Sequence, residues 1–137
     1  LIWVTLSDYI GRPLTFSLIF IVDIIMLATL LIFHIPMVFV VALCLLMSCY
    51  GAGFSVIPAY LGDVFGTKEL GAIHGYILTA WAMAGMVGPV LLSYTHQMLH
   101  SYATTIITFI IVDMVALFVS FWVQRDILRI KKQVFEK

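Results

Sequence analysis

The chain has few charged residues. Only 10% of its 137 residues are Asp, Glu, Lys or Arg, whereas 64% are hydrophobic, and the mean hydropathy is +1.16. A soluble domain of this length cannot cover so much apolar surface with so few charged side chains. The composition therefore excludes an ordinary soluble protein and predicts that lipid surrounds much of the chain.

Net charge and cysteine are also scarce, and each scarcity excludes a class of function. The formal net charge is zero, so there is no electrostatic basis for binding nucleic acid. Cys44 and Cys49 lie five residues apart in one apolar stretch and cannot face each other on a helix, so we expect two small buried side chains. No nucleophile–base set, phosphate-binding loop or metal cluster is visible, and we expect neither an enzyme nor a bound cofactor or metal.

Four long apolar stretches divide the chain. An α-helix rises about 1.5 Å per residue, so about 20 residues cross a hydrocarbon core of about 30 Å. We therefore predict an all-α fold, a polytopic membrane helical bundle. Its complete spans cover about 13–33, 36–60, 70–94 and 102–124.

Basic residues are missing from two of the segments that join these spans. Positively charged residues are retained on the cytoplasmic side of a membrane. This rule places 7–13, 61–70 and the tail 125–137 in the cytoplasm and the turns at 34–36 and 95–101 outside, in a multi-pass protein of the cell membrane. The seven basic residues are Arg12, Lys68, Arg125, Arg129, Lys131, Lys132 and Lys137.

Small residues and prolines in the second and third spans predict helix packing and bending. Two glycines and a proline in the later half of the second span predict a bend. In the third span a small residue at every fourth position lets two helix backbones approach closely. The residues concerned are Gly51, Gly53, Pro58, Ala80, Ala84, Gly88 and Pro89.

Asp23 and Asp113 are the only charges predicted deep in the membrane. Segments 18–26 and 108–116 are similar, and each places one Asp near the middle of a span, as inverted structural repeats do. A carboxylate at the bilayer centre costs roughly 2.5–3.5 kcal/mol on insertion scales, so each should face protein. We interpret both as structural acids, with a proton relay as the alternative.

Two parts of the chain resemble a known family. Residues 7–13, Ser-Asp-Tyr-Ile-Gly-Arg-Pro, are similar to the Asp-x-x-Gly-Arg loop of major facilitator superfamily transporters, in the copy that joins helices eight and nine. Residues 51–68, with 71–75, 78–81 and 88–89, more specifically resemble the oxalate/formate antiporter family within that superfamily. The resemblance covers most of the chain except the last span and the tail.

This resemblance implies that the spans are helices nine to twelve of a twelve-helix carrier. Residues 1–124 would form part of the C-terminal transmembrane half, and 125–137 a cytoplasmic tail. The chain opens at Leu1 without a Met, so we expect the N-terminal helices of the same carrier to be missing from it. In the family, helices ten and eleven line the substrate cavity, helices nine and twelve are peripheral, and two halves rock around a central site.

Asp8, Gly11 and Arg12 match the family loop, and the resemblance implies that they form a cytoplasmic gate. In that family the Asp and the Arg belong to a charge network that latches this side in one conformation. A charge pair at a moving interface can be made in one state and broken in the other. Helix capping combined with topology charge is the alternative reading.

Tyr50, Ser55, Thr79 and Trp81 are the candidate residues of the substrate cavity. Trp81 lies about ten residues into the third span, too deep for an interfacial aromatic belt. Aromatic rings and hydroxyls, including that of Ser48, can enclose a carboxylate without a permanent charge. The alternative is that these residues only pack helices.

The complete spans contain no basic residue, which narrows the substrate class. A dicarboxylate in a low-dielectric cavity needs one or two cationic partners, so we favour a monocarboxylate over oxalate. The predicted function is a secondary carrier of small organic anions that works by alternating access, through exchange or ion coupling. The alternatives are an efflux carrier of unrelated small molecules, or a truncated membrane segment that does not transport.

Overall fold

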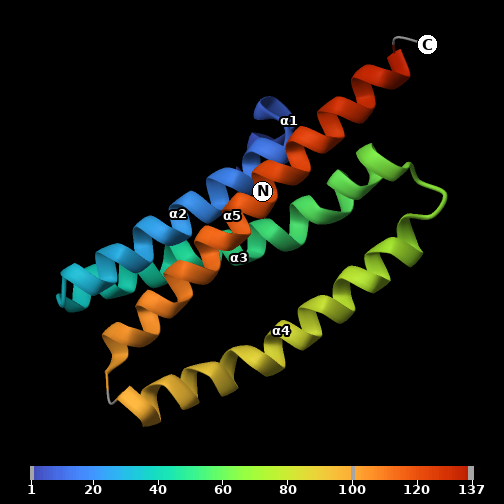
Figure 1. The fold of residues 1–137 in the computed structure, drawn as a ribbon. Coiled ribbons are helices and arrows are strands. Elements are labelled where there is room, and N and C mark those ends of the chain that lie inside the picture. Colours follow the sequence, from blue (N-terminus) through green and yellow to red (C-terminus); the bar gives the residue numbers. More distant parts are fainter. Residues whose placement is uncertain (1, 100, 136–137) are drawn as a thin grey trace.

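The structure is a computed structural model that describes residues 2–99 and 101–135, where every regular element is an α-helix (Figure 1). The predicted all-α fold class, a polytopic helical bundle, is confirmed. The last four helices run alternately in opposite directions and are joined at their ends. The helices are α1 (Ile2–Ile10), α2 (Arg12–Ile32), α3 (Pro36–Phe65), α4 (Leu70–Leu99) and α5 (Tyr102–Phe135).

Glycine and proline set the helix boundaries. Gly11 alone separates α1 from α2, and Gly66 ends α3. Their φ angles are 95° and 76°, a region that residues with a Cβ atom avoid. Pro13 and Pro36 lie in the first turns of α2 and α3, where the missing backbone N–H leaves no hydrogen bond unmade.

Two connections are shorter than the sequence indicated. Within the predicted loop 7–13 only Gly11 is non-helical, because α1 and α2 extend to either side of it. α4 continues to Leu99, well into the predicted turn at 95–101. The Thr95 hydroxyl there donates to the carbonyl oxygen four residues earlier at 2.8 Å, so this polar residue is satisfied inside the helix and does not end it.

α2 is the central helix of the bundle. It packs along both α3 and α5, whereas α4 is set apart from this group (Figure 1). Cys49 and Ala52 of α3 form the buried core with Ile19 of α2, since small residues allow membrane helices to approach closely. Cys49 is therefore buried as predicted, but the prediction for Cys44 is wrong, because that side chain is exposed.

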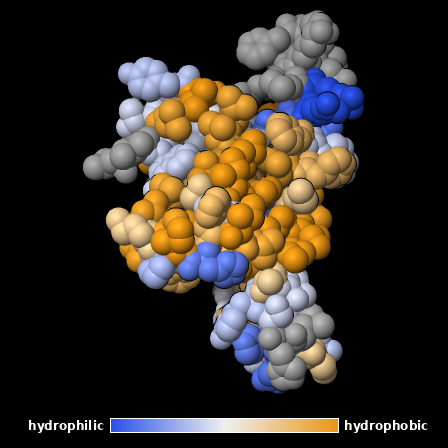
Figure 2. All heavy atoms as spheres, turned by 90° about the vertical axis from the view of Figure 1, so that its left-hand side faces the viewer, coloured by the Kyte–Doolittle hydropathy of each residue, from blue (hydrophilic) through white to orange (hydrophobic). Residues whose placement is uncertain are grey.

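Most large apolar side chains point away from the chain's own interior. Phe118 is 73% exposed and Met37 72%. In Figure 2 apolar side chains fill the centre of the visible face, and strongly hydrophilic ones gather mainly at its margins. By length and composition, α2, α3, α4 and α5 can each cross a membrane. The fold is that of a multi-pass membrane protein.

Candidate functional site

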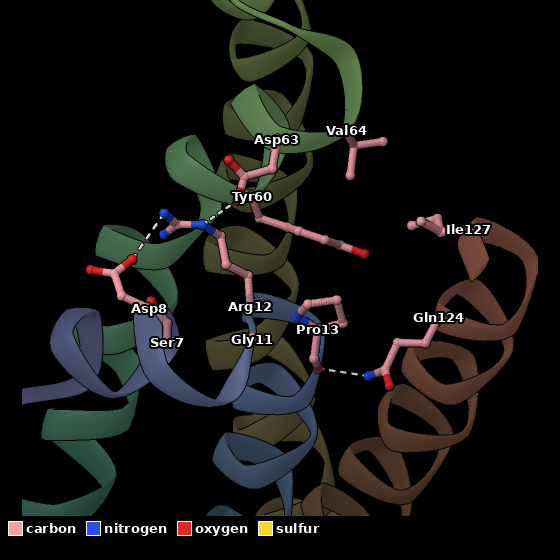
Figure 3. Close-up of a pocket in the computed structure, with 10 residues that line it drawn as sticks. All are labelled: Ser7, Asp8, Gly11, Arg12, Pro13, Tyr60, Asp63, Val64, Gln124 and Ile127. Carbon is pink, nitrogen blue, oxygen red and sulfur yellow. Dashed lines mark hydrogen bonds and ion pairs between the residues drawn. The ribbon is translucent and has the colours of Figure 1, made fainter. Parts of the chain in front are cut away.

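Three charged side chains, Asp8, Arg12 and Asp63, meet where α1, α2 and α3 converge (Figure 3). We name them the charge cluster, and we name this end of the bundle the charged end. Arg12 Nη2 lies 3.0 Å from Asp8 Oδ1, and Arg12 Nε donates a hydrogen bond to Asp63 Oδ2. The Arg12 side chain is 21% exposed, against 54% for Asp8 and 57% for Asp63. One partly buried guanidinium thus links three helices through two hydrated carboxylates.

Local backbone geometry accounts for this meeting. Gly11 turns the chain so that Arg12 begins α2 only four residues after Asp8, and Asp63 comes from the last turn of α3. The sequence predicted that Asp8, Gly11 and Arg12 act together, and the structure does place them together. Asp63 was not predicted from the sequence. The signal that could have found it is its place in segment 61–70, which is predicted to lie on the same side of the membrane as 7–13.

A cavity of about 350 Å³ lies beside the charge cluster, between the adjoining ends of α1, α2 and α3 and the part of α5 around Gln124. Arg12 lines this cavity, and its Nη1 atom is buried without a hydrogen-bond partner among the described residues. A buried donor without a partner is costly. The arrangement can therefore hold these helix ends together through ion pairs, and breaking the ion pairs would release them.

A second group, the aromatic cluster, joins α3 to α4 and consists of Tyr50, Phe54 and Trp81. The Phe54 and Trp81 ring centroids are 3.6 Å apart, and Tyr50 meets Trp81 edge to face at 5.3 Å with an interplanar angle of 86°. The structure thus brings together the two aromatic residues that the sequence singled out. Phe54 was missed, although its position four residues after Tyr50 places both on one helix face.

The hydroxyl groups predicted for the cavity have partners within the chain. The Ser55 hydroxyl lies 3.1 Å from one backbone oxygen of its own helix and 3.0 Å from another. Thr79 donates to the Tyr76 carbonyl at 2.7 Å. Ser48 accepts a hydrogen bond from the Trp3 indole at 2.8 Å, which joins α1 to α3. Each of these residues makes a structural contact, and their role toward a substrate stays a prediction.

The two intramembrane acids lie in the packed group of helices. Asp23 of α2 is half-buried, and its Oδ1 atom has no hydrogen-bond partner among the described residues. The side chain of Cys49 lies against its carboxyl group, and Asp113 of α5 is close enough to interact with it electrostatically. The sequence did not predict this proximity. Their assignment as structural acids stays a prediction.

The predicted packing and bending residues fall on continuous helices. α3 runs unbroken through Pro58 and α4 through Pro89. A Cβ atom added at any of the glycines named for packing would meet nothing within 4 Å, and the small residues on α4 are exposed or half-buried. The packing role of these residues stays a prediction. The residues are Gly51, Gly53, Pro58, Ala80, Ala84, Gly88 and Pro89.

Residues 2–99 and 101–135 contain no group of three or more His, Cys, Asp or Glu that could hold a metal ion.

Comparison with known proteins identifies the family. A family model described as Major Facilitator Superfamily matches residues 1–136. No curated protein and no solved structure matches the chain. The family match spans the charge cluster, the aromatic cluster and all four apolar helices, and the chain therefore belongs to the Major Facilitator Superfamily of membrane transporters.

Proposed function

We propose that this transporter is a secondary carrier of small organic anions, with monocarboxylates as its preferred substrates. The observation that carries the proposal is the aromatic cluster. Tyr50 is 57% exposed and meets Trp81 edge to face. Ring edges carry partial positive charge and the Tyr50 hydroxyl can donate a hydrogen bond, so this surface suits a single carboxylate.

The distribution of basic residues supports a monoanion over a dianion. No Lys or Arg occurs at positions 13–67 or 69–124. Burying two negative charges without a cation nearby is far more costly than burying one. On the resemblance of residues 51–68, we also propose that the transporter belongs to the oxalate/formate antiporter family. We do not propose oxalate as its substrate.

The charge cluster supports alternating access. In the proposed cycle Asp8, Arg12 and Asp63 hold the charged end closed, and their ion pairs break when that end opens. The basic residues after Gln124 support a cytoplasmic location for this end and for the C-terminus. We assign α2 to α5 as helices nine to twelve, with preceding helices of the same carrier completing the cavity beside α3 and α4.

Uptake competition in membrane vesicles that contain the protein tests the proposal. Unlabelled lactate, pyruvate or formate should reduce the uptake of a labelled monocarboxylate at lower concentrations than oxalate does. Trp81→Ala should weaken uptake, whereas Trp122→Ala, which changes a 63% exposed residue of α5, should not. Equal competition by cationic or neutral compounds would instead indicate efflux of unrelated small molecules. Absence of carboxylate uptake would contradict the proposal.

A further inference from the structure

One glutamine, Gln124 of α5, connects α5 to the first turn of α2. Its Nε2 atom donates to the Pro13 carbonyl oxygen at 2.6 Å (Figure 3). It also donates to Ser17 Oγ at 2.7 Å. Ser120 Oγ, one turn earlier on α5, is 3.3 Å away. The amide nitrogen carries two hydrogens, and the two shorter contacts use both of them. The donors of Gln124 are therefore committed to the neighbouring helix.

The bonds from Gln124 are contacts between two helices. They bind a carbonyl oxygen and a hydroxyl oxygen of α2 and do not cap its N-terminal N–H groups, for which Gly11 provides no side-chain cap either. Ser17 is only 2% exposed, so its bond to Gln124 is shielded from water. The backbone that Gln124 holds is also the backbone from which the Arg12 side chain extends, because Pro13 directly follows Arg12.

We propose that Gln124 is a positioning residue of the charge cluster: it holds the first turn of α2 against α5 and thereby sets the reach of Arg12 to Asp63. Gln124 lines the same cavity as Arg12 and Asp63 but bonds to neither of them in any contact given by the structure. Its effect on the cluster is thus indirect. The positioning role of Gln124 does not depend on the proposed gating role of the cluster. One consequence does rest on it: opening of the charged end involves α5 as well as α2.

The test measures the accessibility of the cavity, in full-chain protein embedded in membranes. The reporter is Val64→Cys, a half-buried residue of the cavity wall, in a Cys44→Ser, Cys49→Ala background. Gln124→Leu should raise the rate at which a membrane-permeant maleimide labels the reporter by about tenfold, as expected for two lost interhelical hydrogen bonds. Ser17→Ala removes one acceptor and should raise the rate by about threefold.

A double-variant comparison separates positioning from general loosening. Asp63→Asn alone should also raise labelling, and adding Gln124→Leu should raise it little further, because both changes act through Arg12. If the increases in labelling rate of the two single variants multiply in the double variant, the two changes act independently, and this would overturn the proposal. So would equally increased labelling of Ala42→Cys, which is 2% exposed and remote from the cavity, since that would indicate loss of packing along the whole bundle.

Gln97 provides the matched control. Like Gln124, it has a serine four residues earlier on its own helix, and it donates to that serine at 3.1 Å, but this contact is exposed and stays within α4. Gln97→Leu should leave reporter labelling unchanged. Labelling does not depend on any substrate, so a protein that fails to carry carboxylates but shows these labelling rates would contradict the proposed function and support the role of Gln124.

Discussion

The charge cluster and the aromatic cluster lie in regions that are built differently. Around the charge cluster, α2 is packed by both α3 and α5, and side-chain bonds fix its first turn. α4, which carries Trp81, packs less closely on its neighbours and meets α3 through aromatic rings. The chain thus fixes the position of its ion pairs by packing, whereas it leaves the helix beside its aromatic surface open to other molecules or helices.

The largest effect should come from reversing the charge at the centre of the packed region. Arg12→Glu would place three acids together, so we expect uptake to fall by about tenfold or more through repulsion in a partly buried site. Adding Asp63→Arg should restore part of it, as measured by vesicle uptake normalised to protein level. Arg129→Glu is the control, because that side chain is 80% exposed and lies 4.0 Å from Asp126 on its own helix. An equal loss in the control would remove the special role of the cluster.

A paired substitution tests the contrast in packing directly. Ala52 is 2% exposed, so Ala52→Leu should overpack the core and lower the free energy of unfolding by about 1–3 kcal/mol. Ala84 is exposed on α4, and Ala84→Leu should change it by less than about 0.5 kcal/mol. Titration with SDS in mixed micelles measures both. A large cost at Ala84 would show that another helix packs on the small residues of α4.

Substitutions at two glycines test the same contrast at the level of the backbone, with smaller expected effects. Gly11→Ala should cost about 1–2 kcal/mol, because its φ of 95° is unfavourable for a residue with a Cβ atom. Gly51 is helical and has open space around it, so Gly51→Ala should stabilise α3 by about 0.5–1 kcal/mol. The same SDS titration compares them. Equal effects at the two positions would contradict the assigned turn.

The hydrogen bond between α4 and α5 should contribute less to the free energy of unfolding. The Thr95 and Thr105 hydroxyls are 3.0 Å apart, and Thr105 is 3% exposed. A double-mutant cycle with valine at both positions should give a coupling of about 0.6 kcal/mol, the usual value for such bonds in membrane proteins. A coupling near zero would mean that α4 is even less attached than its contacts indicate.

The smallest effect should follow from changing the intramembrane acids. Asp23→Asn and Asp113→Asn keep the size of each side chain, and neither acid belongs to the aromatic cluster. We expect the dependence of uptake on external pH to match that of the unchanged protein. A lost proton dependence in either variant would replace the structural assignment by a relay.

From the sequence we could predict the features that depend on residues close together in the chain. Apolar length and charge distribution were enough for the helical fold class, and the first complete span was predicted from about residue 13, next to the start of α2 at Arg12. The partners of the α2 start could not be predicted in the same way. Asp63 lies 51 residues from Arg12 and Gln124 lies 111 residues from Pro13, so these contacts exist only because of how three helices pack.

The single-residue joint at Gly11 has a mechanical consequence. One residue spans about 3.8 Å, so the end of α1 has to move with the start of α2. The Trp3 indole of α1 donates a hydrogen bond to Ser48 near the middle of α3. α1 therefore links the start of α2 to the middle of α3 as well as to the charge cluster.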